Sequence, residues 1–196
     1  MKKKLVVVLI ICLSLLIFHN FLIRQYFISK IEYVDYDEYI LLDYLNGKKN
    51  KASYVGADFM IVIGYNAEEK IECVWTYDYD KRIEYQYNMQ EDDLKKVGNN
   101  EDRPINLNNG QLTALLKNNT KFKLIGTDEI NNRSCYILEF KTSEASVIAI
   151  YLDKELLYTV KYVEKFIGER KEKNIINDYE LDLELKHRDI FKEYIN

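Results

Sequence analysis

The side chains that most often carry out chemistry in enzymes are scarce in this sequence of 196 residues. Beyond residue 24 there is one histidine, His187, which lies in a charged stretch near the C-terminus. A Ser-His-Asp or Cys-His mechanism needs a histidine as its base, and these charged neighbours favour an exposed side chain without such a role. The acidic run at residues 91–93 lacks the Asp-x-Asp-x-Asp-Gly order of a calcium loop. We interpret it as a solvated charge run rather than as a calcium or glycosidase site.

Motifs for cofactors and metals are also missing from the sequence. It contains no Gly-x-Gly-x-x-Gly and no Walker pattern, the glycine-rich segments that bind nucleotide phosphates. Its two histidines are too few for a zinc site built on several imidazoles. We therefore predict a protein that is not an enzyme and that has no cofactor and no metal. An enzyme would need carboxylates gathered in a cleft.

Two cysteines, Cys73 and Cys135, lie beyond the N-terminal segment. In a domain outside the cytoplasm they can form one disulfide. They can equally be two small buried apolar residues. Metal binding is the weakest interpretation, because no histidine or further cysteine is spaced around them.

The first 24 residues are typical of a membrane segment. Residues 5–23 contain no Asp, Glu, Lys or Arg and are bounded by Lys4 and Arg24. About 20 apolar residues cross a bilayer as a helix. Three lysines precede the apolar segment, and such residues favour the cytoplasmic side. The sequence thus predicts a single-pass signal anchor at residues 1–24, with the C-terminal domain outside the cytoplasm.

Two processed forms are alternatives to this anchor. A cleavable signal peptide needs small residues before the cut, and no small-x-small pattern occurs between Ile17 and Ile28. A lipoprotein needs a small residue before the modified cysteine, whereas Ile11 precedes Cys12. We rank the uncleaved anchor first, cleavage second and lipidation last.

Charge is unevenly distributed along the chain. Residues 1–24 hold four of the 28 basic side chains and none of the 32 acidic ones, so the rest of the chain carries a net charge of about −8. Binding to nucleic acid needs an excess of lysine and arginine. We therefore exclude nucleic acid as a partner and attribute the acidic character to solubility.

After the anchor, the pattern predicts a helix over residues 35–46. Asp35 and Glu38 resemble a capping box, and Asn46 and Gly47 are typical of a helix end. The lysine-rich residues 48–51 are predicted to be a solvated loop. Residues 25–51 then form a juxtamembrane segment with the first helix, and residues 52–196 form the main domain.

From residue 57 onward the apolar residues recur with a period of two. In residues 71–79, for example, Cys73, Trp75 and Tyr77 alternate with more polar neighbours. This alternation is typical of half-buried antiparallel strands. We predict strands at 57–63, 71–79, 82–87, 122–126, 134–140, 146–152, 158–162 and 175–185, a helix at 109–119, a short docking segment at 189–191, and a loop with one short strand at 91–109. Several strands with two short helices describe an α+β domain.

A family resemblance accompanies this pattern. The strands that read KLIGTDEINNRSCYILEF and IAIYLDKELLYTVKYVE, and the ending YELDLELKHRDIFKEY, resemble the LolA-like lipoprotein-carrier superfamily over residues 52–194. The resemblance implies a strongly curved antiparallel sheet, a half-barrel, with helices on its concave side. Family members bind acyl chains or partner proteins there. Some Gram-positive relatives are anchored envelope proteins, and a clostridial group of lipoproteins supports a cortex amidase in spore germination.

Aromatic residues supply the candidate binding surface. Tyrosine combines apolar area with a polar tip, which suits a ligand cavity or a protein interface. The predicted cavity-lining residues are Phe59, Ile61, Trp75, Tyr77, Tyr85, Tyr136, Leu138 and Phe140. Their facing depends on strand register, because a slip of one residue reverses it.

Two functions follow from these predictions. The first is a non-enzymatic, membrane-anchored extracytoplasmic protein that holds an apolar ligand such as a lipid tail. The second is a module that binds a protein partner and regulates a cell-wall or spore-cortex hydrolase. An empty apolar groove inside the curved sheet would favour the first function, and a groove filled by the protein's own side chains would favour the second.

Overall fold

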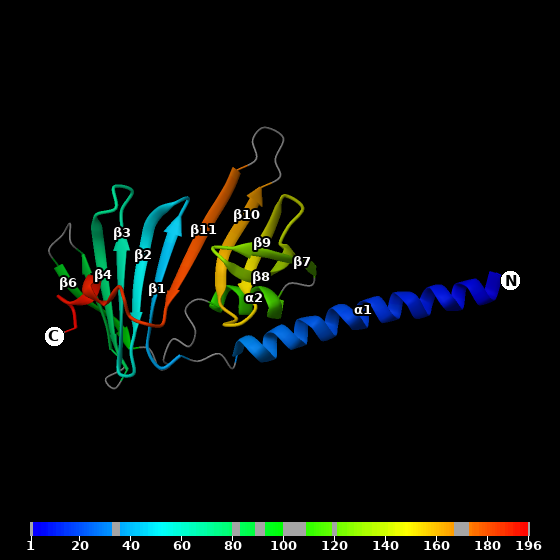
Figure 1. Ribbon diagram of the computed structural model, residues 1–196, viewed down its shortest axis with the longest axis horizontal. Helices are drawn as coiled ribbons and strands as arrows, with labels where there is room; N and C mark the ends of the chain where they lie inside the picture. The colour runs from blue at the N-terminus through cyan, green and yellow to red at the C-terminus, as the bar shows by residue number, and fades with distance from the viewer. Residues whose placement is uncertain are drawn as a thin grey trace.

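A curved antiparallel sheet with a long N-terminal helix makes up the computed structural model, which describes residues 2–32, 36–79, 83–88, 93–99, 109–118, 121–166 and 173–195 (Figure 1). Helix α1 (Lys2–Glu32) extends away from the sheet, and α2 (Gly110–Asn118) packs beside its last turns. The strand order is β6-β5-β4-β3-β2-β1-β11-β10-β9-β8-β7, so β6 and β7 are the edges. The predicted α+β class and the curved antiparallel sheet are confirmed.

The strands are close to those that the alternation predicts from residue 57 onward. Their bounds are β1 (Tyr39–Leu45), β2 (Lys48–Val55), β3 (Phe59–Tyr65), β4 (Ile71–Asp78), β5 (Ile83–Asn88), β6 (Asp93–Asn99), β7 (Phe122–Ile130), β8 (Arg133–Lys141), β9 (Ser146–Asp153), β10 (Thr159–Phe166) and β11 (Lys173–Asp182). A 3₁₀ turn, η1 (Arg188–Phe191), stands where we predict the docking segment. Of the predicted 91–109 loop, residues 93–99 form β6, and residues 91–92 and 100–108 lie outside the described residues.

The helix predicted at residues 35–46 is wrong, because strand β1 occupies this segment. Five consecutive residues of β1, from Tyr39 to Asp43, are buried, as in a strand covered on both faces. Asn46 and Gly47 have φ angles of 50° and 79°. Two successive positive φ angles make the tight turn of a hairpin, so this pair connects β1 to β2 instead of ending a helix.

The predicted solvated loop at residues 48–51 is also wrong, because these residues begin β2. Lys51 pairs with Asp43 on one side and with Gly64 on the other. The lysines therefore occupy ladder positions in the middle of the sheet order. Asn131 and Asn132 have φ angles of 51° and 61° and make a similar turn between β7 and β8.

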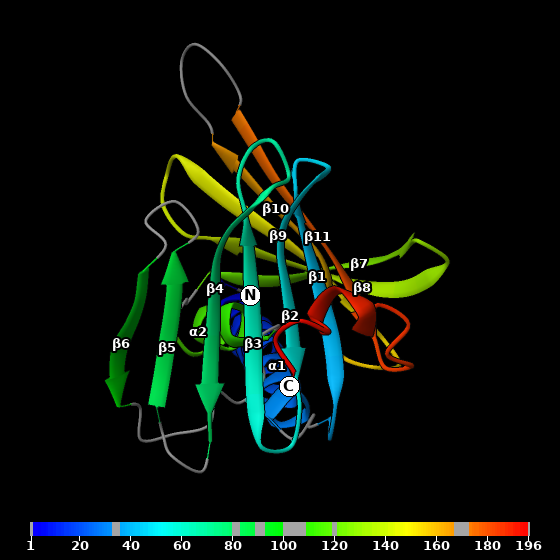
Figure 2. The same cartoon turned by 90° about the vertical axis from the view of Figure 1, so that its left-hand side faces the viewer.

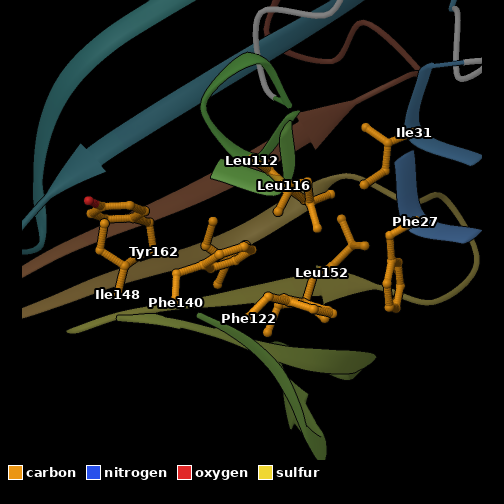
Figure 3. Close-up of a cluster of buried hydrophobic side chains, with 11 residues drawn as sticks. Phe27, Ile31, Leu112, Leu116, Phe122, Phe140, Ile148, Leu152 and Tyr162 are labelled. Atoms are coloured by element: carbon orange, nitrogen blue, oxygen red, sulfur yellow. The ribbon is translucent and has the colours of Figure 1, made fainter. Parts of the chain in front are cut away.

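The side chains of α1 and α2 cover one face of the sheet, which we call the helix face. Here Phe27 and Ile31 of α1 and Leu112 and Leu116 of α2 pack against strands β7 to β10. All four side chains are at most 2% exposed. The strand residues of this cluster are Phe122, Leu138, Phe140, Ile148, Ile150, Leu152 and Tyr162 (Figure 3).

The opposite face, which we call the C-terminal face, is covered over β1 to β4 by the end of the chain (Figure 2). Phe191 of η1 is fully buried against a cluster that includes Ile40, Leu42 and Ile61. The first half of the sheet is therefore covered by the C-terminal segment, and the second half by the two helices.

Side chains of residues 2–13, which include much of the predicted anchor, are outside the described part of the chain. Within the described part, no helix is long and apolar enough to cross a membrane.

Replacing Phe191 by alanine should lower the free energy of unfolding by about 3–5 kcal/mol, because the change leaves a cavity under the C-terminal segment. Urea unfolding of the full chain in neutral detergent measures this loss. Lys192→Ala, at the exposed neighbouring position, is the matched control and should change stability by less than about 0.5 kcal/mol. Equal stability of the two variants would show that η1 is not part of the folded core.

Candidate functional site

Five of the eight predicted lining residues share one face of the sheet, and three do not. In antiparallel strands, residues paired directly across the ladder point to the same face. Ile61 pairs with Thr76, which pairs with Tyr85, and this row lies on the C-terminal face because Ile61 packs with Phe191. Phe59 packs at the margin of the same cluster, and the side chain of Tyr85 lies outside the described residues. Ile61 and Phe59 therefore do not line the helix face.

Trp75 and Tyr77 lie on the helix face of β4. Trp75 pairs with Val62, Val62 pairs with Ser53, and Ser53 pairs with Leu41 of β1. These four residues therefore point to the same face. The indole ring lies over Gly64, where an added Cβ would approach it to 3.1 Å. Trp75 and Val62 are both half-buried and belong to none of the buried clusters among the described residues.

Tyr136, Leu138 and Phe140 lie on the same face at the other end of the sheet. Leu138 and Phe140 are completely buried under the two helices, and the ring of Tyr136 meets that of Phe27 edge-on at 5.3 Å. Side chains of the two helices fill this part of the helix face (Figure 3). The eight residues therefore do not form one cavity.

Helix α2 is fastened to the sheet by Asn109, which is completely buried just before the helix. Its side-chain amide donates to the carbonyl of Leu157 at 2.6 Å, and its oxygen accepts from the backbone N–H of Thr159 at 3.2 Å. Its own carbonyl accepts from the N–H of Thr113. Buried hydrogen bonds of this kind are costly to break, so they fix α2 on the helix face.

A buried carboxylate interrupts the apolar surface between the two ends of the helix face. Asp43 is 6% exposed and accepts hydrogen bonds from the side-chain amides of Asn50 (3.1 Å) and Asn177 (3.3 Å). Burial raises the pKa of Asp43, although these two amides and Lys51 oppose the change. Burial, followed by the charge of Asp43, raises the pKa of Tyr179 opposite it. The centre of this face is thus polar.

An open groove lies elsewhere, along β11. It has a volume of about 610 Å³ and runs between the C-terminal segment and the β7–β8 turn. Asp178, Glu180 and Asp182 alternate along β11 and, with Glu184, give the groove four carboxylates. Its cations are Arg133 and Lys186, and its floor includes Leu156, Tyr158 and Val160.

Three of the four carboxylates have partners. Lys161 approaches Asp178 to 3.5 Å, Lys186 approaches Glu184 to 2.7 Å, and His187 Nδ1 lies 3.0 Å from Asp182. Glu180 is exposed, and no hydrogen bond or ion pair is recorded for it among the described residues. The groove therefore presents net negative charge over an apolar floor.

Asp182 also ties the C-terminal segment to the end of β11. It accepts from the backbone N–H groups of Glu184 (3.1 Å) and His187 (2.9 Å). Burial alone would raise the pKa of Asp182, but the hydrogen bonds from His187 and Lys186 outweigh it and lower this pKa. The charged neighbours of His187 in the sequence predict an exposed residue without a role, whereas the structure assigns it this structural one.

Both cysteines are free thiols in the structure. Cys73 lies on β4 and Cys135 on β8, and these strands are not neighbours in the sheet. The disulfide is therefore not formed, and Cys135 is a fully buried apolar residue. Burial raises the pKa of both thiols, which disfavours the reactive thiolate. Among the described residues there is no group of three side chains able to hold a metal ion.

No protein-family model matches the chain, and no curated protein sequence matches it. Solved structures are similar in fold. An uncharacterized conserved protein from Thermus thermophilus is 9% identical, with 80% of this chain and 85% of that chain covered and a TM-score of 0.50. Lipoprotein LppX of Mycobacterium tuberculosis is 11% identical over 80% and 94% of the two chains, with a TM-score of 0.47.

A LolA superfamily protein from Nitrosomonas europaea is also similar, at 11% identity over 87% and 98% of the two chains and a TM-score of 0.34. Structural neighbours of this chain thus include LolA superfamily proteins and lipoproteins.

Replacing Asp182 by asparagine should lower the free energy of unfolding at pH 7 by about 1–2 kcal/mol, because a charged acceptor is lost. The folded-state pKa of Asp182 lies below its unfolded value of about 3.9. Its contribution is therefore present above that value and is lost as the pH falls through the folded-state pKa. Urea unfolding at pH 7 and in acid should show the difference between wild type and variant closing in acid. Asp189→Asn, at an exposed position, is the control, and a difference that persists undiminished in acid would contradict this role.

Proposed function

We propose that this chain is a non-enzymatic binding protein of the cell envelope, anchored in a membrane by α1, whose extracytoplasmic domain docks a protein partner. The main support is the filled helix face, where side chains of α1 and α2 take the space that an apolar ligand would need. The buried hydrogen bonds of Asn109 hold this filling in place. A filled groove is the condition that favours partner binding over ligand holding.

The anchor is supported by the part of α1 that projects from the domain. Leu15, Phe18, Phe21 and Leu22 are each about half exposed or more. Isolated apolar helices of this kind are unstable in water, and a bilayer would cover them. Because the last turns of the same helix are buried in the domain, the domain is held beside the membrane and does not travel as a soluble carrier would.

The acidic groove along β11 is the docking site that we propose. Its alternating carboxylates and apolar floor suit a segment of a partner that carries lysine or arginine beside apolar residues. A cell-wall or spore-cortex hydrolase is the class of partner that the family resemblance indicates, and this identity stays a prediction.

Reversing the charge of Glu180 should release the partner. Glu180→Lys places a cation in the groove at an exposed position, so the fold should be unaffected while a basic segment is repelled. The full chain, solubilised from its native membranes, should retain a stoichiometric protein partner as wild type and lose most of it in this variant. Glu68→Lys, an equal charge reversal on the exposed β3–β4 turn, should retain it. Retention by both variants would contradict the groove as the docking site.

An apolar ligand such as a lipid tail is a second candidate, which one observation favours. Trp75 and Val62 lie half-buried on the helix face, away from the cluster that the helices fill. Trp75 is the only tryptophan in the chain, so its fluorescence reports on this place alone.

Phospholipids with brominated acyl chains should quench Trp75 fluorescence if a tail lies against the indole. We expect no quenching, because partner binding is the favoured function. Trp75→Phe, which lacks the only tryptophan, gives the background signal from light scattering. Strong, saturable quenching would reverse the order of the two candidates. Quenching that is absent, together with no retained partner, would overturn the proposed binding function as a whole.

A further inference from the structure

Helix α1 meets α2 at a shallow pocket where apolar side chains and cations come together. The pocket has a volume of about 450 Å³ and is lined by Phe21, Arg24, Gln25, Ile28, Leu116 and Lys117. It lies at the place where α1 leaves the domain (Figure 1). Nothing in the proposed docking of a partner at β11 uses these residues.

Arg24 is fixed at this pocket by α2. Its Nε donates to the carbonyl oxygen of Leu116, which lies in the last turn of α2, where carbonyls have no partner within the helix. The negative end of the helix dipole favours a cation there. The two terminal nitrogens of Arg24 take no part in this bond.

The depth of the pocket follows from its place in the sequence. Arg24 directly follows the apolar residues 5–23. If those residues span a bilayer, Arg24 stands at the level of the lipid headgroups, where arginine and lysine are found at the ends of membrane helices. Phe21, one turn earlier, then lies at the level of the first acyl carbons.

The charge of this end of the domain differs from that of the rest. Residues beyond 24 carry a net charge of about −8, which an anionic membrane surface would repel. On the other side of α2, however, Lys121 and Lys141 line a neighbouring pocket, where Glu144 is the one carboxylate. Cations thus line the pockets on both sides of α2.

We propose that the pocket between α1 and α2 binds an anionic phospholipid from the membrane that holds α1. The lipid phosphate lies between Arg24 and Lys117, and an acyl chain lies along Phe21. Arginine binds phosphate through paired N–H groups, and each cation near the surface strengthens binding to anionic lipid. This inference rests on the proposed membrane anchor and is independent of the partner site at β11.

The test is native mass spectrometry of the full chain in neutral detergent, titrated with phosphatidylglycerol and with phosphatidylcholine of the same acyl chains. The wild type should bind the first phosphatidylglycerol about tenfold more tightly than phosphatidylcholine. Lys117→Gln and Arg24→Gln should each lower this preference about fivefold, as expected for the loss of one cation. Arg24→Lys, which keeps the charge, should lower it less than Arg24→Gln.

Lys70→Gln is the matched control, because it removes one exposed cation on the distant β3–β4 turn. It should leave the preference unchanged. Equal binding of the two lipids to the wild type, or an equal loss in Lys70→Gln, would overturn the lipid site. Thermal unfolding of each variant shows whether Arg24→Gln lowers lipid binding by destabilising α2. If it does, Lys117→Gln still tests the lipid site, because it changes an exposed residue.

Extraction of native membranes with alkaline carbonate separates this inference from the anchor on which it rests. A chain that stays with the membranes but lacks the lipid preference would overturn the lipid site alone. A chain that is released by carbonate would overturn the anchor and, with it, the lipid site.

Discussion

Burial of the last turns of α1 against the sheet is the constraint on which the rest of the structure depends. Phe27 and Ile31 lie under the strands with Leu112 and Leu116 of α2, and each such side chain contributes roughly 2 kcal/mol when it is removed from water. The same helix projects from the domain a few turns earlier. Helix and sheet are therefore packed as one unit, and the projecting part of α1 is continuous with the buried core.

This arrangement changes what the concave side of the sheet can do. In a half-barrel with an open hollow, the apolar lining is available to a ligand. Here the hollow is filled by helices, fastened through Asn109, and its centre carries the buried Asp43. In the proposed function, the binding surface therefore lies outside the hollow, in the groove along β11.

Acidic and basic side chains line different pockets of the described chain. Carboxylates alternate on β11, where the strand turns them all to one face. Arginine and lysine gather where α1 and α2 meet. In the proposed arrangement, the cations between α1 and α2 face an anionic bilayer and are attracted to it, whereas the carboxylates of β11 would be repelled by it.

Local patterns in the sequence determined much of this. The alternation after residue 57 predicted the strands, and the pattern of residues 109–119 predicted α2, because each pattern depends only on near neighbours. Tertiary structure alone decided that residues 39–45 form a central strand, that Ile61 and Trp75 face opposite sides, and that α1 fills the hollow. These outcomes depend on register and on which distant elements meet, and a continuous apolar run contains no information on either.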